Sequence, residues 1–296
     1  MNMSLLGVPS QALLGQILLG LINGAFYSML SLGFAIIFGL LNVINFAHGV
    51  QYMMGAFAAW MLLAYAGVGF WPALIIAPLL VGALGIAVER LFLRRMYGAD
   101  HLYGLLLTVG LALFAEGLFR KAYGSSGQPY PIPQLLMGGW NIGFMFLPIY
   151  RGWVLLTSLF LCLGTWLLID YTRLGSYLRA ATENPQLVQA FGINVPRILT
   201  ITFGLGAVLA GLAGVLAAPI YSVNPQMGSD LIIVVFAVVV IGGMGSIIGS
   251  ILTGFGLGVI EGLTKVFYPQ GSTTAIFAIM AIVLIVKPGG LFGKAA

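Results

Sequence analysis

The chain has 296 residues, of which 60% are hydrophobic and only 6% are charged, and its mean hydropathy is +1.08. Soluble domains are closer to half apolar and one quarter charged, so this composition excludes a water-soluble fold of the same size. The net charge of +5 is scattered, without the clustered basic face that a nucleic-acid partner requires. The composition therefore predicts a multi-pass protein of the lipid bilayer.

Nine apolar stretches follow one another, several of them long enough to cross a bilayer as a helix of about 20 residues. They are 13–41, 52–65, 71–93, 102–119, 153–169, 198–220, 231–241, 247–267 and 273–286. The first is too long for one straight crossing, so we expect it to be tilted or broken near Gly33 and Gly39. The pattern predicts one all-α transmembrane domain over residues 1–296, with eight to ten membrane-embedded helices, some of them half-crossings.

A polar break, NVINFAHGVQ, separates the first two apolar stretches. Polar side chains at membrane depth are costly and usually face a cavity or the bundle interior. We interpret Asn42, Asn45, His48 and Gln51 as part of a broken helix that lines a substrate pathway. The alternative is a short surface loop between two complete crossings, and His48 taken singly fits a structural, hydrogen-bonded histidine better than a ligand.

The distribution of basic side chains predicts sidedness, because cytoplasmic loops retain Lys and Arg. Placing residues 170–197 in the cytoplasm puts eight basic residues inside: Arg90, Arg94, Arg95, Arg173, Arg179, Arg197, Lys287 and Lys294. Four lie outside or near that interface: Arg120, Lys121, Arg151 and Lys265. The largest extracytoplasmic loop is then about 120–152, which we interpret as a plain connection, with a surface for an external partner as the alternative.

The polar segment 170–197, DYTRLGSYLRAATENPQLVQAFGINVPR, is expected to contain two short helices. Asn184 suits a helix N-cap, Pro185 the first helical position and Gly192 a left-handed helix stop. A helix over 185–191 has about two turns and must pack on something to be stable. Two sets of apolar residues share faces: Leu174, Tyr177, Leu178 and Ala181 on the first helix, and Leu187, Val188 and Phe191 on the second. Spacing leaves open whether these faces dock on a soluble partner or lie on the membrane or on the protein itself.

A glycine-rich segment near the end of the chain, IGGMGSIIGSILTGFGLGVIEG, resembles a second break. Small residues let membrane helices approach closely, so we assign Gly242, Gly243, Gly245 and Gly249 to helix contacts or a half-helix. The further ionisable residues at membrane depth are Glu89, Glu116, Glu261 and Lys265.

The sequence lacks the motifs of several classes of enzyme and nucleotide-binding protein. It lacks the nucleotide-binding GxxxxGK[ST] pattern, the metalloprotease HExxH pattern and the GxSxG nucleophile elbow. Neither His48 nor His101 has a Cys or carboxylate partner at metal-ligand spacing, and Cys162, inside an apolar run, is interpreted as an inert thiol. We therefore expect no catalytic residues, no metal site and no cofactor, and an energy source on another chain.

Three blocks of this sequence resemble permease subunits of branched-chain amino acid ABC importers, the LivH type. They are GLINGAFYSMLSLGFAIIFGLLNVINFAHGVQYMMGAFAAW (20–60), RAATENPQLVQAFGIN (179–194) and VVIGGMGSIIGSILTGFGLG (239–258). The likeness covers nearly the whole chain. It implies a helical bundle with broken helices near the midplane, in the bacterial inner membrane.

The resemblance also implies partners: a second homologous permease subunit, two cytoplasmic ABC ATPase subunits, and a periplasmic substrate-binding protein that delivers a small-molecule substrate. By position it assigns ATPase coupling to Glu183, Asn184, Pro185, Ala190 and Gly192, with Leu187 and Phe191 as anchors.

The leading hypothesis is thus a transport subunit that moves branched-chain or related amino acids by alternating access. Urea, short amides or another small polar solute are alternative substrates within the family. A stand-alone secondary transporter or channel is an alternative of another class, with Glu116 as its best ion-coupling carboxylate, and an intramembrane enzyme ranks last.

Overall fold

The structure, a computed structural model, describes residues 4–5, 8–41, 44–97 and 101–293. Its α-helices are α1 (Ser10–Leu41), α2 (Ala47–Ala66), α3 (Phe70–Leu91), α4 (His101–Tyr123), α5 (Ile149–Tyr171), α6 (Arg173–Glu183), α7 (Pro185–Ala190), α8 (Val195–Tyr221), α9 (Met227–Gly242), α10 (Ile247–Phe267) and α11 (Ser272–Val286). Three short 3-10 helices are η1 (Leu93–Met96), η2 (Gln134–Leu136) and η3 (Pro269–Gly271). Two small antiparallel hairpins pair β1 (Ser4–Leu5) with β2 (Val8–Pro9) and β3 (Gly139–Asn141) with β4 (Phe146–Pro148).

Seven helical segments of the described chain are long and apolar enough to cross a membrane. They are Ser10–Gly39, Phe70–Met96, Leu102–Tyr123, Ile149–Tyr171, Val195–Tyr221, Ile247–Phe267 and Pro269–Val286. α2, with 20 residues, and α9, with 16, lie among them. At 1.5 Å per residue α9 is about 24 Å long, less than the roughly 30 Å apolar thickness of a bilayer. The expected all-α, polytopic architecture is confirmed.

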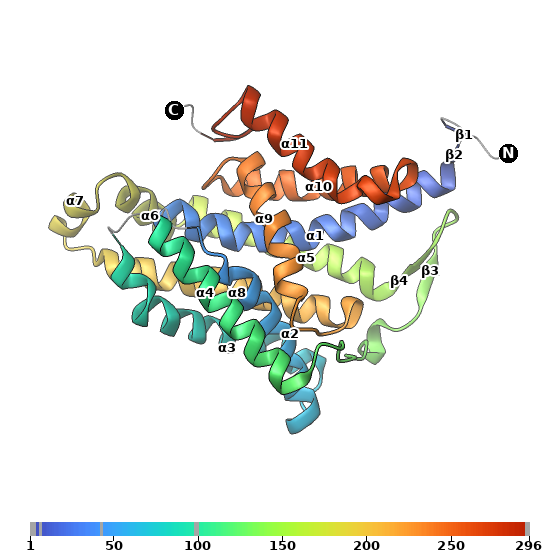
Figure 1. The fold of residues 1–296 in the computed structure, drawn as a ribbon, viewed down its shortest axis with the longest axis horizontal. Coiled ribbons are helices and arrows are strands. Elements are labelled where there is room, and N and C mark those ends of the chain that lie inside the picture. The colour runs from blue at the N-terminus through green and yellow to red at the C-terminus, as the bar shows by residue number, and fades with distance from the viewer. Residues whose placement is uncertain (1–3, 6–7, 42–43, 98–100, 294–296) are drawn as a thin grey trace.

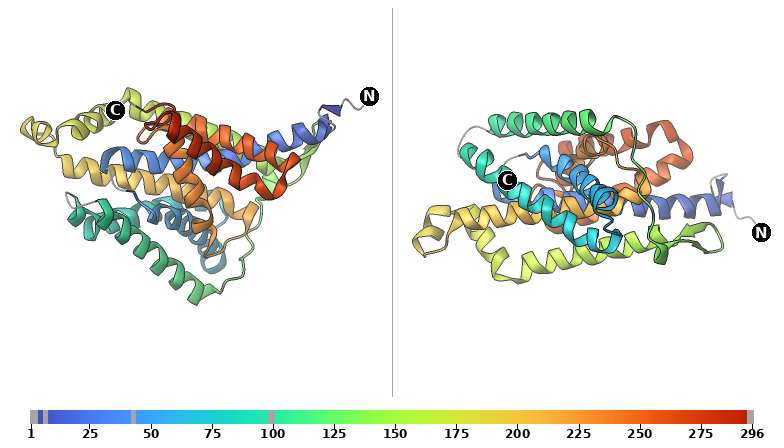
Figure 2. Two further views of the ribbon diagram at one scale, coloured as in Figure 1. Left: turned by 45° about the horizontal axis from the view of Figure 1, so that its top comes forward. Right: turned by 90° about the horizontal axis from the view of Figure 1, so that it is seen from below.

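The long helices run roughly along one axis, so their ends gather at two poles (Figure 1). α1, α3, α5 and α11 finish, and α4, α8 and α10 begin, at the pole where α6 and α7 project; we name it the α7 end. The N-terminus and the β3–β4 hairpin lie at the opposite end, as the turned views also show (Figure 2). Seven of the eight basic residues expected inside belong to segments at the α7 end, and Lys294 lies outside the described residues.

α1 forms the centre of the bundle and is one uninterrupted helix, so of the two expected alternatives, a tilt or a break near Gly33 and Gly39, the break is wrong. Both glycines instead allow close contacts. A Cβ on Gly33 would lie 2.9 Å from the carbonyl oxygen of Gly206 on α8, and one on Gly39 would lie 3.1 Å from the Cα of Gly245. Glycine is needed at these two positions because a side chain would not fit between the closely packed segments, and neither glycine breaks the helix.

The connection between α4 and α5 is ordered and covers residues 124–148, somewhat less than the expected loop. Gln128 and Val223 exchange backbone hydrogen bonds of 2.7 and 2.8 Å, which attach the connection to the chain after α8. Tyr130 is buried against Phe70, and burial raises the pKa of Tyr130 to about 12. The β3–β4 hairpin completes a folded cap on this end of the bundle.

Candidate functional site

The α6–α7 hairpin carries the capping residues that its sequence predicts. The side-chain Oδ1 of Asn184 accepts a hydrogen bond from the Leu187 N–H at 2.9 Å, and Pro185 occupies the first turn of α7. Gly192 has a φ of +82°, the left-handed conformation that ends a helix at little cost only for glycine. Local chemistry therefore fixes where α7 begins and ends.

A small apolar cluster holds α7 onto its neighbours. Val188 is buried together with Ala181 of α6 and Val195 of α8. The expected common face of Leu187, Val188 and Phe191 is therefore divided, because Val188 packs against the protein itself while Leu187 and Phe191 are exposed.

Beyond this cluster, the surface of the hairpin is exposed. Leu187, on α7, and Phe191, just after it, keep 55% and 77% of their surface exposed. α7 itself is the outermost element at the α7 end (Figure 1). The other assigned coupling residues are exposed around them: Glu183, Asn184, Pro185, Ala190 and Gly192. The hairpin thus presents two large apolar side chains, one helical turn apart, on a polar projection. On the first helix the expected face is also divided, since Leu178 and Ala181 are buried while Tyr177 is exposed.

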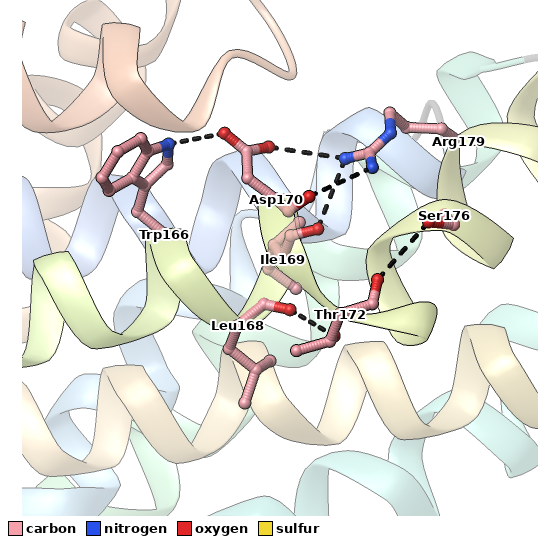
Figure 3. Close-up of polar contacts among 7 residues, drawn as sticks. All are labelled: Trp166, Leu168, Ile169, Asp170, Thr172, Ser176 and Arg179. Carbon is pink, nitrogen blue, oxygen red and sulfur yellow. Dashed lines mark hydrogen bonds and ion pairs between the residues drawn. The ribbon is translucent and has the colours of Figure 1, made fainter.

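The joint between α5 and α6 has tight geometry. Gly175 faces the end of α5, where an added Cβ would lie 2.5 Å from the carbonyl carbon of Ile169 and closer still to its oxygen. The guanidinium of Arg179 donates to the Ile169 carbonyl at 3.3 Å and pairs with the Asp170 carboxylate at 3.4 Å. Trp166 donates its indole N–H to the same carboxylate, so Asp170 lies between the two side chains (Figure 3). These contacts hold α6 against the end of α5.

Sequence reasoning missed this joint, although one signal was present. A glycine inside a helix costs about 1 kcal/mol relative to alanine, so its presence often has a structural reason. Beside the joint lies a cavity of about 570 Å³ between α1, α6, the turn from α9 to α10 and the segment after α11. Its walls include Gly39, Arg179, Gly245 and Phe292. α6 therefore has open space on one side.

The four glycines assigned late in the chain surround the turn between α9 and α10. A Cβ on Gly242 would lie 2.7 Å from the carbonyl carbon of Gly249, and one on Gly243 would lie 2.8 Å from the Cα of Gly293. Gly243 and Gly245 have φ values of +100° and +84°, which side chains rarely adopt. The segment after α11 attaches here, since Leu291 N–H donates to the Ile241 carbonyl at 2.8 Å.

The polar residues after α1 lie inside the bundle. α2 begins at Ala47, so His48 and Gln51 occupy its first turns, and both are buried. His48 Nε2 donates to the Leu30 carbonyl at 3.0 Å, and Nδ1 lies 3.1 Å from the Gln51 carboxamide. In this conformation His48 attaches α2 to α1, and Gln51 contacts the other ring nitrogen from within α2. Asn42 lies outside the described residues.

Asn45 has a different environment. Its side chain is buried, yet neither its amide nitrogen nor its oxygen finds a hydrogen-bond partner among the described residues. The backbone on both sides is held, because Thr108 accepts from the Phe46 N–H at 3.2 Å and donates to the Ile44 carbonyl at 3.2 Å. Unpaired buried amides cost about 1–3 kcal/mol, so a water or polar solute that paired with Asn45 would remove this cost.

The buried carboxylates have partners within the chain. Glu261 on α10 accepts from Tyr27 at 2.7 Å and pairs with Lys265 at 2.6 Å. Glu116 on α4 binds Arg120 and Ser229. No sequence signal pointed to Tyr27, which is 234 positions from Glu261.

Glu89 on α3 accepts hydrogen bonds from Tyr97 and Thr200, each at 2.8 Å. Burial, then the hydrogen bond to Glu89 and its charge, raise the pKa of Tyr97, so its hydroxyl remains a donor. Across the described chain, no three His, Cys, Asp or Glu side chains gather in a way that would hold a metal ion.

Comparisons with known proteins agree on one group of relatives. The family model described as "Branched-chain amino acid transport system / permease component" matches residues 16–286. The high-affinity branched-chain amino acid transport system permease protein LivH of Salmonella typhimurium is 29% identical over 300 residues, covering 95% of this chain and 96% of its own length. BraD of Pseudomonas aeruginosa, with the same description, is 31% identical over 296 residues, with the same coverage. LivM of Escherichia coli is 28% identical over 290 residues, covering 90% of this chain and 67% of its own length. No solved structure matches the chain.

Proposed function

This chain belongs to the family of permease components of branched-chain amino acid transport systems, and from that membership we propose that it is one membrane subunit of an ATP-driven importer. It is a multi-pass membrane protein with a transport role. We place it in the bacterial inner membrane with the α7 end in the cytoplasm, which agrees with the basic residues at that end. The proposed substrates are branched-chain or related amino acids.

The proposed assembly needs further chains. A second homologous permease subunit would complete the pathway; LivH and LivM are both named as permease proteins of one kind of system, and both resemble this chain. Two cytoplasmic ATPase subunits would supply the energy, since this sequence has no P-loop motif. A periplasmic binding protein would deliver the substrate to the opposite end.

The observation that carries the proposal is the exposed apolar pair at the α7 end, Leu187 and Phe191. Large apolar side chains that are exposed together on a polar projection often mark a surface that a partner covers. The hairpin is held to the bundle by Val188 and by the joint at Gly175, so a force on α7 passes into α5 and α8. The cavity beside α6 leaves space for α6 to move when α7 is displaced.

Alternating access follows from this connection. ATP closes the two ATPases, α7 moves with the subunit that holds it, and the helices attached to α6 and α7 tilt against α1. Asn45, His48 and Gln51, with Asn42, are the residues that we propose line the substrate pathway when α2 separates from α1. Their amide and imidazole groups suit a small zwitterion, and urea or a short amide remains the alternative cargo within the family.

A stand-alone transporter driven by an ion gradient is less well supported. Such a transporter needs an intramembrane carboxylate that is free to bind and release the ion. Glu116 and Glu261 each hold a basic residue four positions away and a hydroxyl from another helix. Those partners give the carboxylates a structural role in joining helices.

Reconstitution tests the function directly. Proteoliposomes that contain this chain, its second permease subunit and the ATPases, with the binding protein outside, should accumulate radiolabelled leucine only when ATP is enclosed. Unlabelled urea in excess should not reduce the uptake. Leucine uptake by the chain alone, driven by an ion gradient, would contradict the proposal. Strong competition by urea would indicate that urea or a short amide, rather than an amino acid, is the substrate.

A further inference from the structure

Three arginines meet in one small cavity at the α7 end. Arg90 lies in the last turn of α3, Arg94 belongs to η1, and Arg197 lies in the first turn of α8. Together with Asn194, Pro196 and Thr200 they line a hollow of about 220 Å³. All three side chains are exposed, so the cavity is accessible from outside the bundle.

The positive charge of this cavity is not neutralised within the described chain. The three ion pairs among the described residues involve other basic side chains: Arg120 with Glu116, Arg179 with Asp170, and Lys265 with Glu261. The nearest acid in sequence, Glu89, is buried and is occupied by two hydroxyl donors, Tyr97 and Thr200. Thr200 thus links the cavity wall to Glu89 and ties α8 to α3.

The N-terminus of α8 adds to the positive electrostatic potential of the cavity. α8 has 27 residues, and Asn194 caps it by accepting from the Arg197 N–H at 3.1 Å. The positive end of a helix dipole favours an anion, and guanidinium groups bind phosphate oxygens through paired hydrogen bonds. Three guanidinium groups and a helix start around one hollow are suited to a phosphate group.

The surroundings indicate which phosphate. The cavity lies where the membrane-spanning segment Phe70–Met96 finishes and Val195–Tyr221 begins. Leu91 and Phe92, which follow Arg90 in the chain and lie outside the lining of the cavity, are exposed apolar side chains. A free phosphate ion would leave these side chains uncovered, whereas the acyl chains of a lipid would cover them. Basic pockets between membrane helices bind anionic head groups by this combination.

We propose that this cavity binds the phosphate head group of an anionic phospholipid of the leaflet at the α7 end. Arg90, Arg94 and Arg197 contact the phosphate, and the acyl chains lie along Leu91 and Phe92. The lipid joins the end of α3 to the start of α8, immediately after the α7 hairpin. It therefore stabilises the base from which that hairpin projects.

Native mass spectrometry of the purified full-length chain tests the site, with phosphatidylglycerol and phosphatidylcholine of identical acyl chains as probes. The variant Arg94→Gln/Arg197→Gln should bind phosphatidylglycerol about tenfold more weakly than the wild type, because charge-assisted hydrogen bonds are lost. Its binding of phosphatidylcholine should not change. The matched control is Arg95→Gln/Arg173→Gln, which removes the same charge at the same end from residues outside the cavity; it should bind both lipids as the wild type does.

A second comparison covers the case in which the double variant fails to fold. Arg94→Gln and Arg95→Gln alter neighbouring residues of η1, and only the first should weaken phosphatidylglycerol binding. Equal losses in the cavity variants and their controls would overturn the proposal, because general charge would then explain the lipid preference. Displacement of the lipid by inorganic phosphate at equal concentration would also overturn it, since the site would then recognise a free anion.

Discussion

Replacing Gly175 by alanine should disturb the joint that positions the α6–α7 hairpin. An added Cβ would lie 2.5 Å from the carbonyl carbon of Ile169, whereas ordinary van der Waals contact begins near 3.4 Å. The end of α5 and the start of α6 must therefore separate by about 1 Å or more. Such separation lengthens the contacts of Arg179 with Asp170 and the Ile169 carbonyl, which are already 3.3–3.4 Å. Overfilled contacts of this kind cost about 1–3 kcal/mol.

Gly164 provides the matched control, because it lies on α5 and a Cβ there would meet nothing within 4 Å. We expect Gly175→Ala to lower the melting temperature in nanodiscs and to increase hydrogen exchange over residues 170–197. Gly164→Ala should be neutral or stabilising by up to about 1 kcal/mol, since alanine favours helix. Equal stability and exchange in the two variants would refute the claim that Gly175 fixes the hairpin on α5.

Three further substitutions test separate contacts. Gly55→Ala places a Cβ 2.5 Å from the Cα of Gly211 on α8. It should lower the free energy of unfolding, measured by thermal unfolding, by about 1–3 kcal/mol. Gly110→Ala, in open space on α4, is the control and should not lower it. Tyr27→Phe removes a donor from buried Glu261 and should destabilise the protein by about 1–3 kcal/mol; an unchanged melting temperature would mean that this hydrogen bond is dispensable. Asn184→Ala should weaken the α7 cap by about 0.5–2 kcal/mol, seen as faster amide exchange in α7, and Asn184→Ser should restore protection if capping is the cause.

Local chemistry explains why part of the fold was predictable from sequence. Asn184, Pro185 and Gly192 define α7 because capping and left-handed stops depend on residues only a few positions apart. The long apolar stretches predicted the membrane helices for the same reason, since bilayer thickness acts on each helix separately.

The errors arose where a distant segment decides the outcome. Val188 was grouped on one face with Leu187 and Phe191 because helical spacing cannot show that Ala181 and Val195 cover the valine alone. A break at Gly33 was one of two alternatives because its sequence neighbours do not reveal the carbonyl of Gly206 or the ring of His48 against it. Whether Asn45 and Gln51 meet a substrate depends on a second conformation, and that assignment stays a prediction.

The central claim is that Leu187 and Phe191 transmit ATPase movement to the bundle. The control pair for the variant Leu187→Ala/Phe191→Ala is Leu113→Ala/Phe114→Ala, because these residues match it in type, are exposed by 65% and 71%, and lie within α4, away from both ends of the bundle. Truncating a hot-spot residue of an interface costs about 2 kcal/mol or more, so if both residues are hot spots the α7 variant should lose most of its ATPase contact.

The decisive measurement is the ratio of leucine transported to ATP hydrolysed in the reconstituted complex. The account predicts that this ratio falls severalfold in Leu187→Ala/Phe191→Ala, with less ATPase retained on the purified permease, and stays at the wild-type value in the control pair. Normal assembly together with a normal transport ratio in the α7 variant would contradict it.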